Sequence, residues 1–276
     1  MSRLCGIFGK PYIDLSDLID TAPFAEIDEE IMCALPRVEP SYTGGSLKWM
    51  GVTAPWVDQD PYVDYMRVIE GFSREELVRF VSYGKEPEGF DPANPGPHHF
   101  GDETDNPLSR EQMLYLKYRY GVYFPWKVCY HLLENDRWED KHSGDGKDFT
   151  EEARQMFPRT VAFIEQLPLQ EIGRCVLFGL EANDHAPAHR DSEPGKALSI
   201  AQSISFDPRG NKRFYVCDPE GSTKTIVDTP IYWFNDMDYH GVEPAPFFRY
   251  SIRVDGVFDN DFVEQVRAAQ RRGAMR

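Results

Sequence analysis

A run of short strand-like segments in the second half of the chain is the feature that most constrains its fold. The segments lie at 173–182, 198–207, 212–218, 223–228, 231–235 and 247–258. Turn residues separate them, as in the Asp-Pro-Arg-Gly-Asn stretch at 207–211. No helical pattern lies between the segments. Many short strands without intervening helices predict an antiparallel sandwich or barrel.

Helical patterns flank this run. A helix of about 15 residues is expected to open at Asp148, because apolar residues follow it at helical spacing, and Asp259–Arg272 indicates a C-terminal helix. The earlier expected elements are helices over Asp28–Leu35, Ser73–Tyr83 and Ser109 to about Tyr118, a strand over Ser46–Val52, a lid-like loop at 85–107 and an exposed loop at 135–148. We expect residues 1–150 to pack on the core and shape the substrate site. Residues 151–276 would form the β core and C-terminal helix of the same compact domain.

Composition excludes several classes of function. Hydrophobic residues make up 41% of the 276 residues and aromatic residues 13%, which is typical of a globular protein. The net charge of −16 argues against binding to nucleic acid or an anionic membrane. It favours a neutral or cationic small molecule or peptide, although an acidic surface is also a common solubility feature. No apolar run of about 18 residues occurs, so no membrane span is expected.

The cysteine content points to a reducing compartment. The five cysteines are odd in number and scattered, and no Cys-x-x-Cys pair occurs, which argues against a zinc ribbon. Free thiols favour the cytoplasm. No long apolar core follows the N-terminal basic residue, so no signal peptide is expected.

Two histidines and one aspartate form a candidate metal site. His189 and Asp191 are one residue apart, so on an extended backbone their side chains point to the same side. His240 follows 240 − 191 = 49 residues later, which leaves room for several strands to go out and return. Two imidazoles and one carboxylate are the ligand set of a non-heme Fe(II) site. The His-Arg-Asp tripeptide also occurs in protein kinases, but no Asp-Phe-Gly follows here.

A candidate anion site follows nine positions after His240. Arg249, Ser251 and Arg253 alternate along 247–254 and therefore share one strand face. A guanidinium fork beside a hydroxyl group suits a carboxylate. Arg253 is a competitor for this role, and either arginine could instead belong to an ion pair within the sheet. Arg249 is preferred because Ser251 completes an Arg-x-Ser pattern.

Taken together, His-x-Asp, the later His and Arg-x-Ser resemble the signature of the Fe(II)/2-oxoglutarate-dependent oxygenases. The segment from Trp233 through His240-Gly241-Val242 to Ile252 is similar to the final strands of that family. Residues 174–191 resemble in layout the aspartyl/asparaginyl hydroxylase and cis-proline hydroxylase branch. The resemblance covers about residues 158–258 and leaves out the first 110 or so, where substrate specificity is expected to lie.

The resemblance implies an α+β protein with a mainly β core, a double-stranded β-helix (jelly roll, cupin-like) with an N-terminal helical and irregular region and flanking helices. It implies that His189, Asp191 and His240 bind Fe(II), and that Arg249 and Ser251 bind the far carboxylate of 2-oxoglutarate. The implied reaction consumes O2, releases succinate and CO2, and hydroxylates a C–H bond of an amino acid, peptide or small natural product. Ascorbate would support it. Asp191 disfavours a halogenase, since halogenating relatives lack that carboxylate.

Other polar and aromatic residues receive less specific readings. His185 is expected near the ligands without binding metal, or at the surface, and His98-His99 in a solvated loop. Asn183 and Asp184 are candidates for orienting ligands or substrate. The aromatic groups are expected to pack in the core rather than to bind substrate: Tyr232, Trp233, Phe234 and the segment 120–126.

Two rival functions stay open. One is a cupin-like metalloenzyme that does not use 2-oxoglutarate, and the other is a jelly-roll binding protein without catalysis. Arg249 and Ser251 argue against the first, and the complete ligand set argues against the second. Substrate identity, the choice among hydroxylation, desaturation and cyclisation, and the oligomeric state do not follow from the sequence.

Overall fold

A computed structural model describes residues 4–40, 51–53, 62–63, 65–84, 108–134, 141, 143–192 and 201–273. The helices are α1 (Phe24–Ala34), α2 (Tyr65–Glu70), α3 (Arg74–Ser82), α4 (Arg110–Tyr120), α5 (Glu151–Met156), α6 (Pro158–Ile164) and α7 (Asn260–Gly273), with a 3-10 turn at Leu35–Arg37. The strands are β1 (Tyr12–Asp14), β2 (Gly51–Thr53), β3 (Tyr62–Val63), β4 (Val122–Tyr123), β5 (Trp126–His131), β6 (Leu169–Leu180), β7 (Ala186–His189), β8 (Ala201–Phe206), β9 (Phe214–Cys217), β10 (Lys224–Ile226), β11 (Ile231–Phe234), β12 (Tyr239–Val242) and β13 (Arg249–Phe258).

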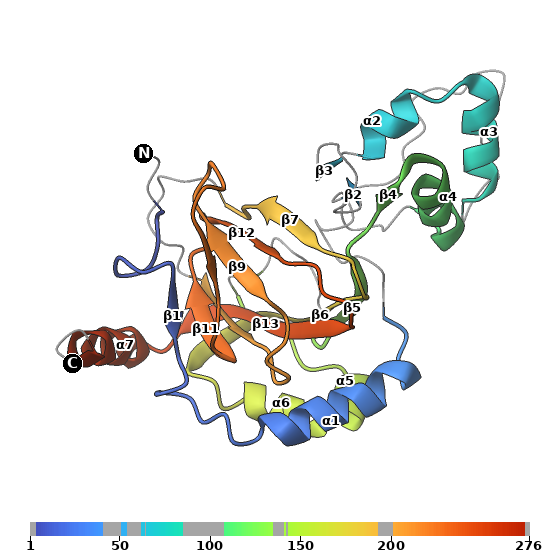
Figure 1. Ribbon diagram of the computed structural model, residues 1–276. Coiled ribbons are helices and arrows are strands. Elements are labelled where there is room, and N and C mark those ends of the chain that lie inside the picture. The colour runs from blue at the N-terminus through green and yellow to red at the C-terminus, as the bar shows by residue number, and fades with distance from the viewer. Residues whose placement is uncertain are drawn as a thin grey trace.

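Two antiparallel sheets form the centre of the molecule (Figure 1). The six-stranded sheet has the order β1-β11-β8-β13-β6-β5, and the four-stranded sheet has the order β10-β9-β12-β7. The long strand β13 pairs with β6 from Arg249 opposite Leu180 to Phe258 opposite Leu169. This mixed α/β architecture with mainly antiparallel strands agrees with the expected α+β class and mainly β core.

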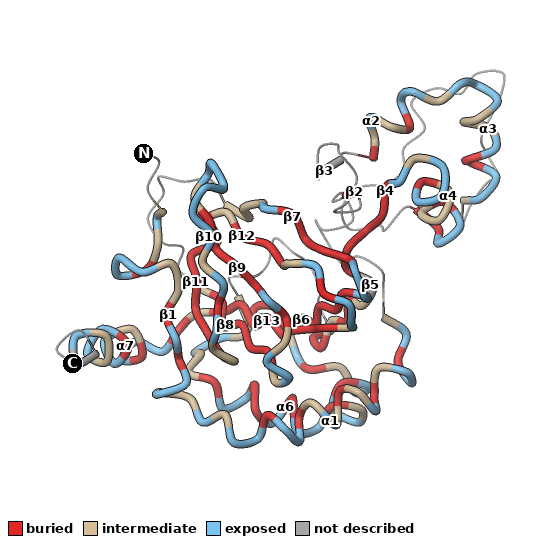
Figure 2. Tube along the Cα trace, viewed as in Figure 1, coloured by how far each residue is buried: buried red, intermediate tan, exposed pale blue. Residues whose placement is uncertain are grey.

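The period-two pattern of the strands divides the hydrophobic core into two parts. On β6, Cys175 and Leu177 face the helices α1, α5 and α6, whereas Val176 and Phe178 face the four-stranded sheet. Figure 2 shows the central strands buried over most of their length. The second part of the core, between the sheets, surrounds the site described below.

A third hydrophobic cluster belongs to α2, α3, α4 and β4, which stand apart from the helices α1 and α6 in Figure 1. Local signals define these helices. Ser109 and Gln112 form a capping box at the start of α4, and Gly121 ends it with φ of 71°. Ser73 caps α3 through the N–H of Glu76.

The predicted helices at 73–83, after Ser109 and at the C-terminus are confirmed as α3, α4 and α7. The single helix predicted from Asp148 is wrong, because the chain forms α5 and α6 there with a break at Phe157. Pro158 explains the break, since it lacks an N–H and suits only the first turn of a helix. The expectations for residues 46–50, 85–107 with His98-His99, and 135–140 lie outside the described residues.

The strand pattern did not mark β7 or β12, although these strands carry His189 and His240. β7 reads Ala-Pro-Ala-His and β12 reads Tyr-His-Gly-Val, so a proline or a glycine weakens the strand signal of each four-residue segment.

Among the described residues, no helix has both the length and the apolar character that crossing a bilayer requires.

Candidate metal centre

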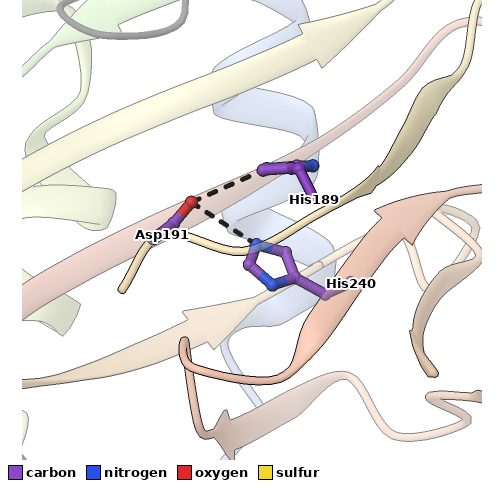
Figure 3. Close-up of side chains that lie close together, drawn as sticks. All are labelled: His189, Asp191 and His240. Atoms are coloured by element: carbon purple, nitrogen blue, oxygen red, sulfur yellow. Dashed lines mark ion pairs between the residues drawn. The ribbon is translucent and has the colours of Figure 1, made fainter. Parts of the chain in front are cut away.

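The register between β7 and β12 brings the candidate ligands together. His189 at the end of β7 lies directly opposite His240 of β12, and Asp191 follows in the turn after β7. The Asp191 Oδ1 atom lies 3.6 Å from His189 Nε2 and 3.7 Å from His240 Nε2 (Figure 3). One ligand atom from each residue lies within 4.8 Å of the others. Two imidazoles and a carboxylate at this spacing can converge on one ion.

Backbone carbonyls fix the orientation of both imidazoles. His189 Nδ1 lies 2.9 Å from the Pro187 carbonyl oxygen, and His240 Nδ1 lies 2.9 Å from the Asp238 carbonyl oxygen. Because a carbonyl can only accept, each Nδ1 carries a proton, and each Nε2 is turned toward Asp191. Burial lowers the pKa of His240 to about 4, so this imidazole is neutral at physiological pH. The His240 ring is thus in the form that binds a metal through Nε2.

Asp191 presents one oxygen to the imidazoles and gives the other to an arginine. Its Oδ2 accepts a hydrogen bond of 2.6 Å from Arg253 Nη1. Burial opposes ionisation of Asp191, but the Arg253 charge outweighs it and holds the pKa of the carboxyl group well below its usual value. Asp191 is therefore an anion with a single oxygen available for a metal.

Arg253 is itself held by a buried chain of alternating charges. Its Nε lies 3.0 Å from Asp255 Oδ1 and 3.2 Å from Ser203 Oγ. Asp255 also accepts hydrogen bonds from Ser203 Oγ and, at 2.6 Å, from Arg174 Nε. The sequence analysis missed Arg174 and Asp255, although charged residues within otherwise apolar strands were a signal: Asp255 of β13 pairs with Arg174 of β6 in the sheet. The chain fixes the position of the metal-binding carboxylate from inside the sheet.

A cavity opens from the three candidate ligands. Aromatic side chains are the largest group in its walls, which also contain two serines, a lysine and an arginine. Besides the ligands, the lining residues are Trp126, Phe178, Ala186, Ser205, Lys212, Phe214, Tyr232, Phe234, Gly241, Val242, Ser251 and Arg253. Tyr232 and Phe234 were expected only as core residues, and they are core residues that also face this cavity. Trp233, between them, points to the other face of its strand and packs with the core beneath the sheet.

Lys212 is a buried cation in the cavity wall that the sequence analysis did not single out. Its Nζ donates a hydrogen bond to Ser251 Oγ and lies 5.3 Å from the ring centroid of Trp126. Burial lowers the pKa of Lys212 to about 7; the nearby charge of Asp207 opposes this effect, and those of Arg253 and Arg249 add to it. Among the described residues, no carboxylate lies within ion-pair distance of this Nζ. An ammonium group in this position is suited to an anionic ligand.

Arg249 takes a place that the sequence analysis did not foresee. The residue is fully buried and does not line the cavity, whereas Ser251 does. Both terminal nitrogens of Arg249 donate to backbone carbonyl oxygens, those of residues 181, 184, 243, 245 and 247. A predicted contact between Arg249 and a co-substrate is disfavoured by this placement. Arg253 is likewise committed to Asp191 and Asp255.

The neighbouring polar residues of the β6–β7 loop do not join the candidate ligands. His185 is buried with its Nδ1 2.5 Å from the Tyr123 hydroxyl oxygen, and it does not line the cavity. Asn183 adopts a positive φ of 66°, and its N–H donates to the Ala245 carbonyl oxygen. The Asp184 carbonyl oxygen accepts from Arg249. These residues shape the loop that precedes β7.

No family model and no curated protein matches the sequence. Three solved structures of similar shape illustrate what the structural comparison finds. A 2OG-Fe(II) oxygenase family protein from Burkholderia pseudomallei aligns at 12% identity over 55% of this chain and 82% of its own, with a TM-score of 0.32. A prolyl-4-hydroxylase from Pseudomonas putida aligns at 15% identity over 40% of this chain and 67% of its own, with a TM-score of 0.26.

The third structure is the non-heme monooxygenase ThoJ in complex with nickel. It aligns at 13% identity over 40% of this chain and 54% of its own, with a TM-score of 0.27. TM-scores this low do not establish a shared fold, so function has to be inferred from the site itself.

Proposed function

We propose that this protein is a non-heme Fe(II)-dependent oxygenase that uses 2-oxoglutarate as co-substrate and oxidises a C–H bond of a second substrate. One observation carries the proposal. Two imidazole Nε2 atoms and one carboxylate oxygen converge at a largely aromatic cavity, and a buried lysine without an ion-pair partner among the described residues lies in the wall of the same cavity. This pairing of a metal-ligand set with an anion receptor matches a co-substrate that has both a metal-chelating end and a carboxylate.

The fit to iron rests on the donor set and its orientation. His189, His240 and Asp191 would supply three ligand atoms, and the Arg253 hydrogen bond keeps Asp191 to one oxygen. A facial set of three protein ligands leaves other coordination positions for co-substrate and O2. Bound Fe(II) would supply the activation of O2, coupled to oxidative decarboxylation of 2-oxoglutarate to succinate and CO2.

Lys212 and Ser251 are the residues that we assign to the far carboxylate of 2-oxoglutarate. Ser251 Oγ accepts a hydrogen bond from Lys212 Nζ, and within the described ranges its own O–H has no other acceptor, so it can donate to a carboxylate. A carboxylate beside Lys212 would favour the charged amine and so oppose the pKa-lowering effect of burial. The rings of Trp126 and Phe214 keep water from this charge pair, which strengthens it.

We also propose that the two sheets form a double-stranded β-helix. Successive strands from β6 to β13 lie in the six-, four-, six-, four-, four-, six-, four- and six-stranded sheets, respectively. This alternation is what a hairpin wound into a roll produces. It places β7 and β12 side by side in one sheet while β13, with Ser251 and Arg253, faces them from the other.

The proposed substrate is an amino acid, a peptide or a small natural product, in keeping with the acidic net charge of −16. Residues 174–191 resemble in layout the aspartyl/asparaginyl and cis-proline hydroxylases, and this resemblance favours an amino acid or a peptide residue as the substrate. Free thiols at all five cysteines support a reducing, cytoplasmic location.

The test is release of succinate by purified protein supplied with Fe(II), 2-oxoglutarate and ascorbate. Uncoupled turnover without the second substrate gives a signal that requires both iron and the co-substrate. We expect succinate from the wild type and from His185→Ala, a buried histidine outside the cavity, and none from His189→Ala. Succinate formation by His189→Ala at the wild-type rate would contradict the proposal. Iron binding by the wild type without consumption of 2-oxoglutarate would favour a cupin-like enzyme of another kind.

A further inference from the structure

The turn between β11 and β12, residues Asn235–Asp238, holds two of the three candidate ligands through its backbone. The Asp236 carbonyl oxygen accepts the N–H of Asp191 at 3.0 Å. The Asp238 carbonyl oxygen accepts a hydrogen bond of 2.9 Å from Nδ1 of His240. The β11–β12 turn therefore sets both the position of the carboxylate residue and the rotation of an imidazole.

The side chains of the same turn are held from the opposite direction by the N-terminal segment Leu4–Lys10, which we call the N-terminal strap. The N–H groups of Cys5 and Gly6 donate to the two carboxylate oxygens of Asp238, at 2.6 and 2.7 Å. The Asn235 Nδ2 donates to the Gly6 carbonyl oxygen at 3.1 Å. The Cys5 thiol also hydrogen-bonds to the Asp238 carboxylate, and the residue Asp238 is only 4% exposed. The strap thus supplies hydrogen bonds to a carboxyl group that would otherwise be buried without them.

The strap is shaped for this contact. Two successive backbone N–H groups that point to one side form a small anion-binding concavity. Gly6 permits it with φ of +60°, and a Cβ at this position would lie 2.7 Å from the Lys10 carbonyl oxygen. Ile7 and Lys10 then pair across a tight turn that contains Phe8 and Gly9.

Further contacts anchor the strap to the body of the protein. The Phe8 ring packs edge-on against Trp233 of β11, with 6.0 Å between centroids, and Arg267 of α7 lies 5.1 Å above the same ring. Directly after the strap, Tyr12 of β1 pairs with Phe234 of β11. The strap is therefore fixed against the end of β11 that leads into the β11–β12 turn.

We propose that the N-terminal strap is a positioning element for the metal centre and that Asp238 is its positioning residue. Asp238 does not touch the metal position with its side chain. The strap holds the Asp238 carboxylate, and the Asp238 carbonyl oxygen accepts a hydrogen bond from His240 Nδ1. In the same turn, the Asp236 carbonyl oxygen accepts a hydrogen bond from the Asp191 N–H. The inference rests on the proposed function only in that His189, Asp191 and His240 bind a divalent metal.

The test compares Gly6→Ala with Gly9→Ala in the full-length protein, with the dissociation constant for Co(II) as readout and the thermal unfolding midpoint measured in parallel. Both glycines have positive φ, so both substitutions introduce backbone strain, but only Gly6 contacts the turn; Gly9 has no atom within 4 Å of an added Cβ. We expect Gly6→Ala and Asp238→Asn to weaken Co(II) binding by about tenfold or more, as loss of a hydrogen bond behind a metal ligand does. Gly9→Ala should bind Co(II) as the wild type does.

Equal Co(II) affinity in Gly6→Ala, Gly9→Ala and the wild type, with only the unfolding midpoint lowered, would show that the strap is merely structural and would overturn the inference. Weakened binding in Asp238→Asn but not in Gly6→Ala would overturn the role of the strap as well. Should Asp238→Asn fail to fold, the glycine pair decides the matter. His240→Ala serves as the separate check: if the wild type bound Co(II) no better than His240→Ala, the metal site itself would be wrong, whatever the glycine variants did.

Discussion

The two groups of polar residues that face the cavity differ in how completely they are bonded before any ligand arrives. Near the metal position, both imidazoles and the carboxylate are oriented by carbonyl oxygens, by Arg253 and by the charges behind it. Elsewhere in the wall, Lys212 carries a charge that only the Ser251 hydroxyl contacts by a hydrogen bond, among the described residues. The metal ligands are preorganised, whereas the ammonium group of Lys212 gains an ion-pair partner only when an anionic ligand binds. Variants should therefore separate metal affinity from co-substrate affinity.

The largest separation is expected from Lys212→Met, which keeps the length and apolar stem of the side chain and removes its charge. Loss of one partner of a buried charge pair should raise the dissociation constant of 2-oxoglutarate about 100-fold while leaving Fe(II) affinity unchanged. Calorimetry with the iron-loaded protein under anaerobic conditions measures both. The matched control is Lys224→Met, which removes an exposed lysine paired with Glu243. Equal effects of the two substitutions would show that Lys212 is not the anion receptor.

Arg253→Lys should have the opposite effect and weaken Fe(II) binding more than 2-oxoglutarate binding. Lysine keeps the positive charge but cannot reach Asp191, Asp255 and Ser203 together as a guanidinium does. We expect Fe(II) affinity to fall by about 10- to 50-fold, with a smaller effect on 2-oxoglutarate affinity. Iron quantification after equilibrium dialysis provides the measurement. A selective loss of 2-oxoglutarate binding would instead assign Arg253 to the co-substrate, the alternative that the strand pattern left open.

The dissociation constant of 2-oxoglutarate is expected to depend on pH, with a change of about tenfold per pH unit above the pKa of Lys212. Lys212 has a pKa of about 7 and must be protonated to bind a carboxylate, so affinity is fully present below this pKa and falls as the pH rises. Between pH 7.5 and 8.5 the dissociation constant should rise about tenfold, since each pH unit above the pKa removes nine-tenths of the charged form. His240 is neutral throughout this range because of its pKa of about 4. A Lys212→Arg variant, charged at every pH used, should give a flat profile; a flat wild-type profile would refute the assignment.

The smallest effect on ligand affinity is expected from Arg249→Met. Its terminal nitrogens bind carbonyl oxygens of the loops before β7 and β13, so the substitution should lower the unfolding midpoint while changing the 2-oxoglutarate dissociation constant less than about threefold. Thermal unfolding and calorimetry on the same sample give both values. If Arg249→Met weakened 2-oxoglutarate binding as much as Lys212→Met, the Arg-x-Ser interpretation would be restored.

The metal ligands were easier to predict from the sequence than the roles of Arg249 and Lys212. His189, Asp191 and His240 were identifiable because ligand chemistry restricts the residue types and because an extended backbone sets the side of the first pair. Arg249 was preferred over Arg253, which shares its strand face, because Ser251 completes an Arg-x-Ser pattern. Its actual partners are carbonyl oxygens of loops, which no side-chain pattern reveals. Lys212 carried a weak signal, a single lysine just before the apolar strand Phe214–Cys217.

Contacts across long sequence separations were the least accessible to prediction. Cys5 and Asp238 are 233 positions apart, and the bond between them involves a backbone N–H that every residue but proline could offer. The break at Pro158 was, by contrast, a local feature that stricter use of proline chemistry would have placed correctly. Local backbone rules and ligand chemistry were thus readable from the sequence, whereas loop packing was not.

The most direct test of the account is the iron content of the anaerobically reconstituted protein and its variants after equilibrium dialysis. We predict one Fe(II) per chain in the wild type and in His185→Ala, and loss of more than about 99% of the affinity in His240→Ala, since a ligand is removed rather than a residue behind it. Full iron occupancy of a folded His240→Ala variant would contradict the central claim that His189, Asp191 and His240 together bind the metal.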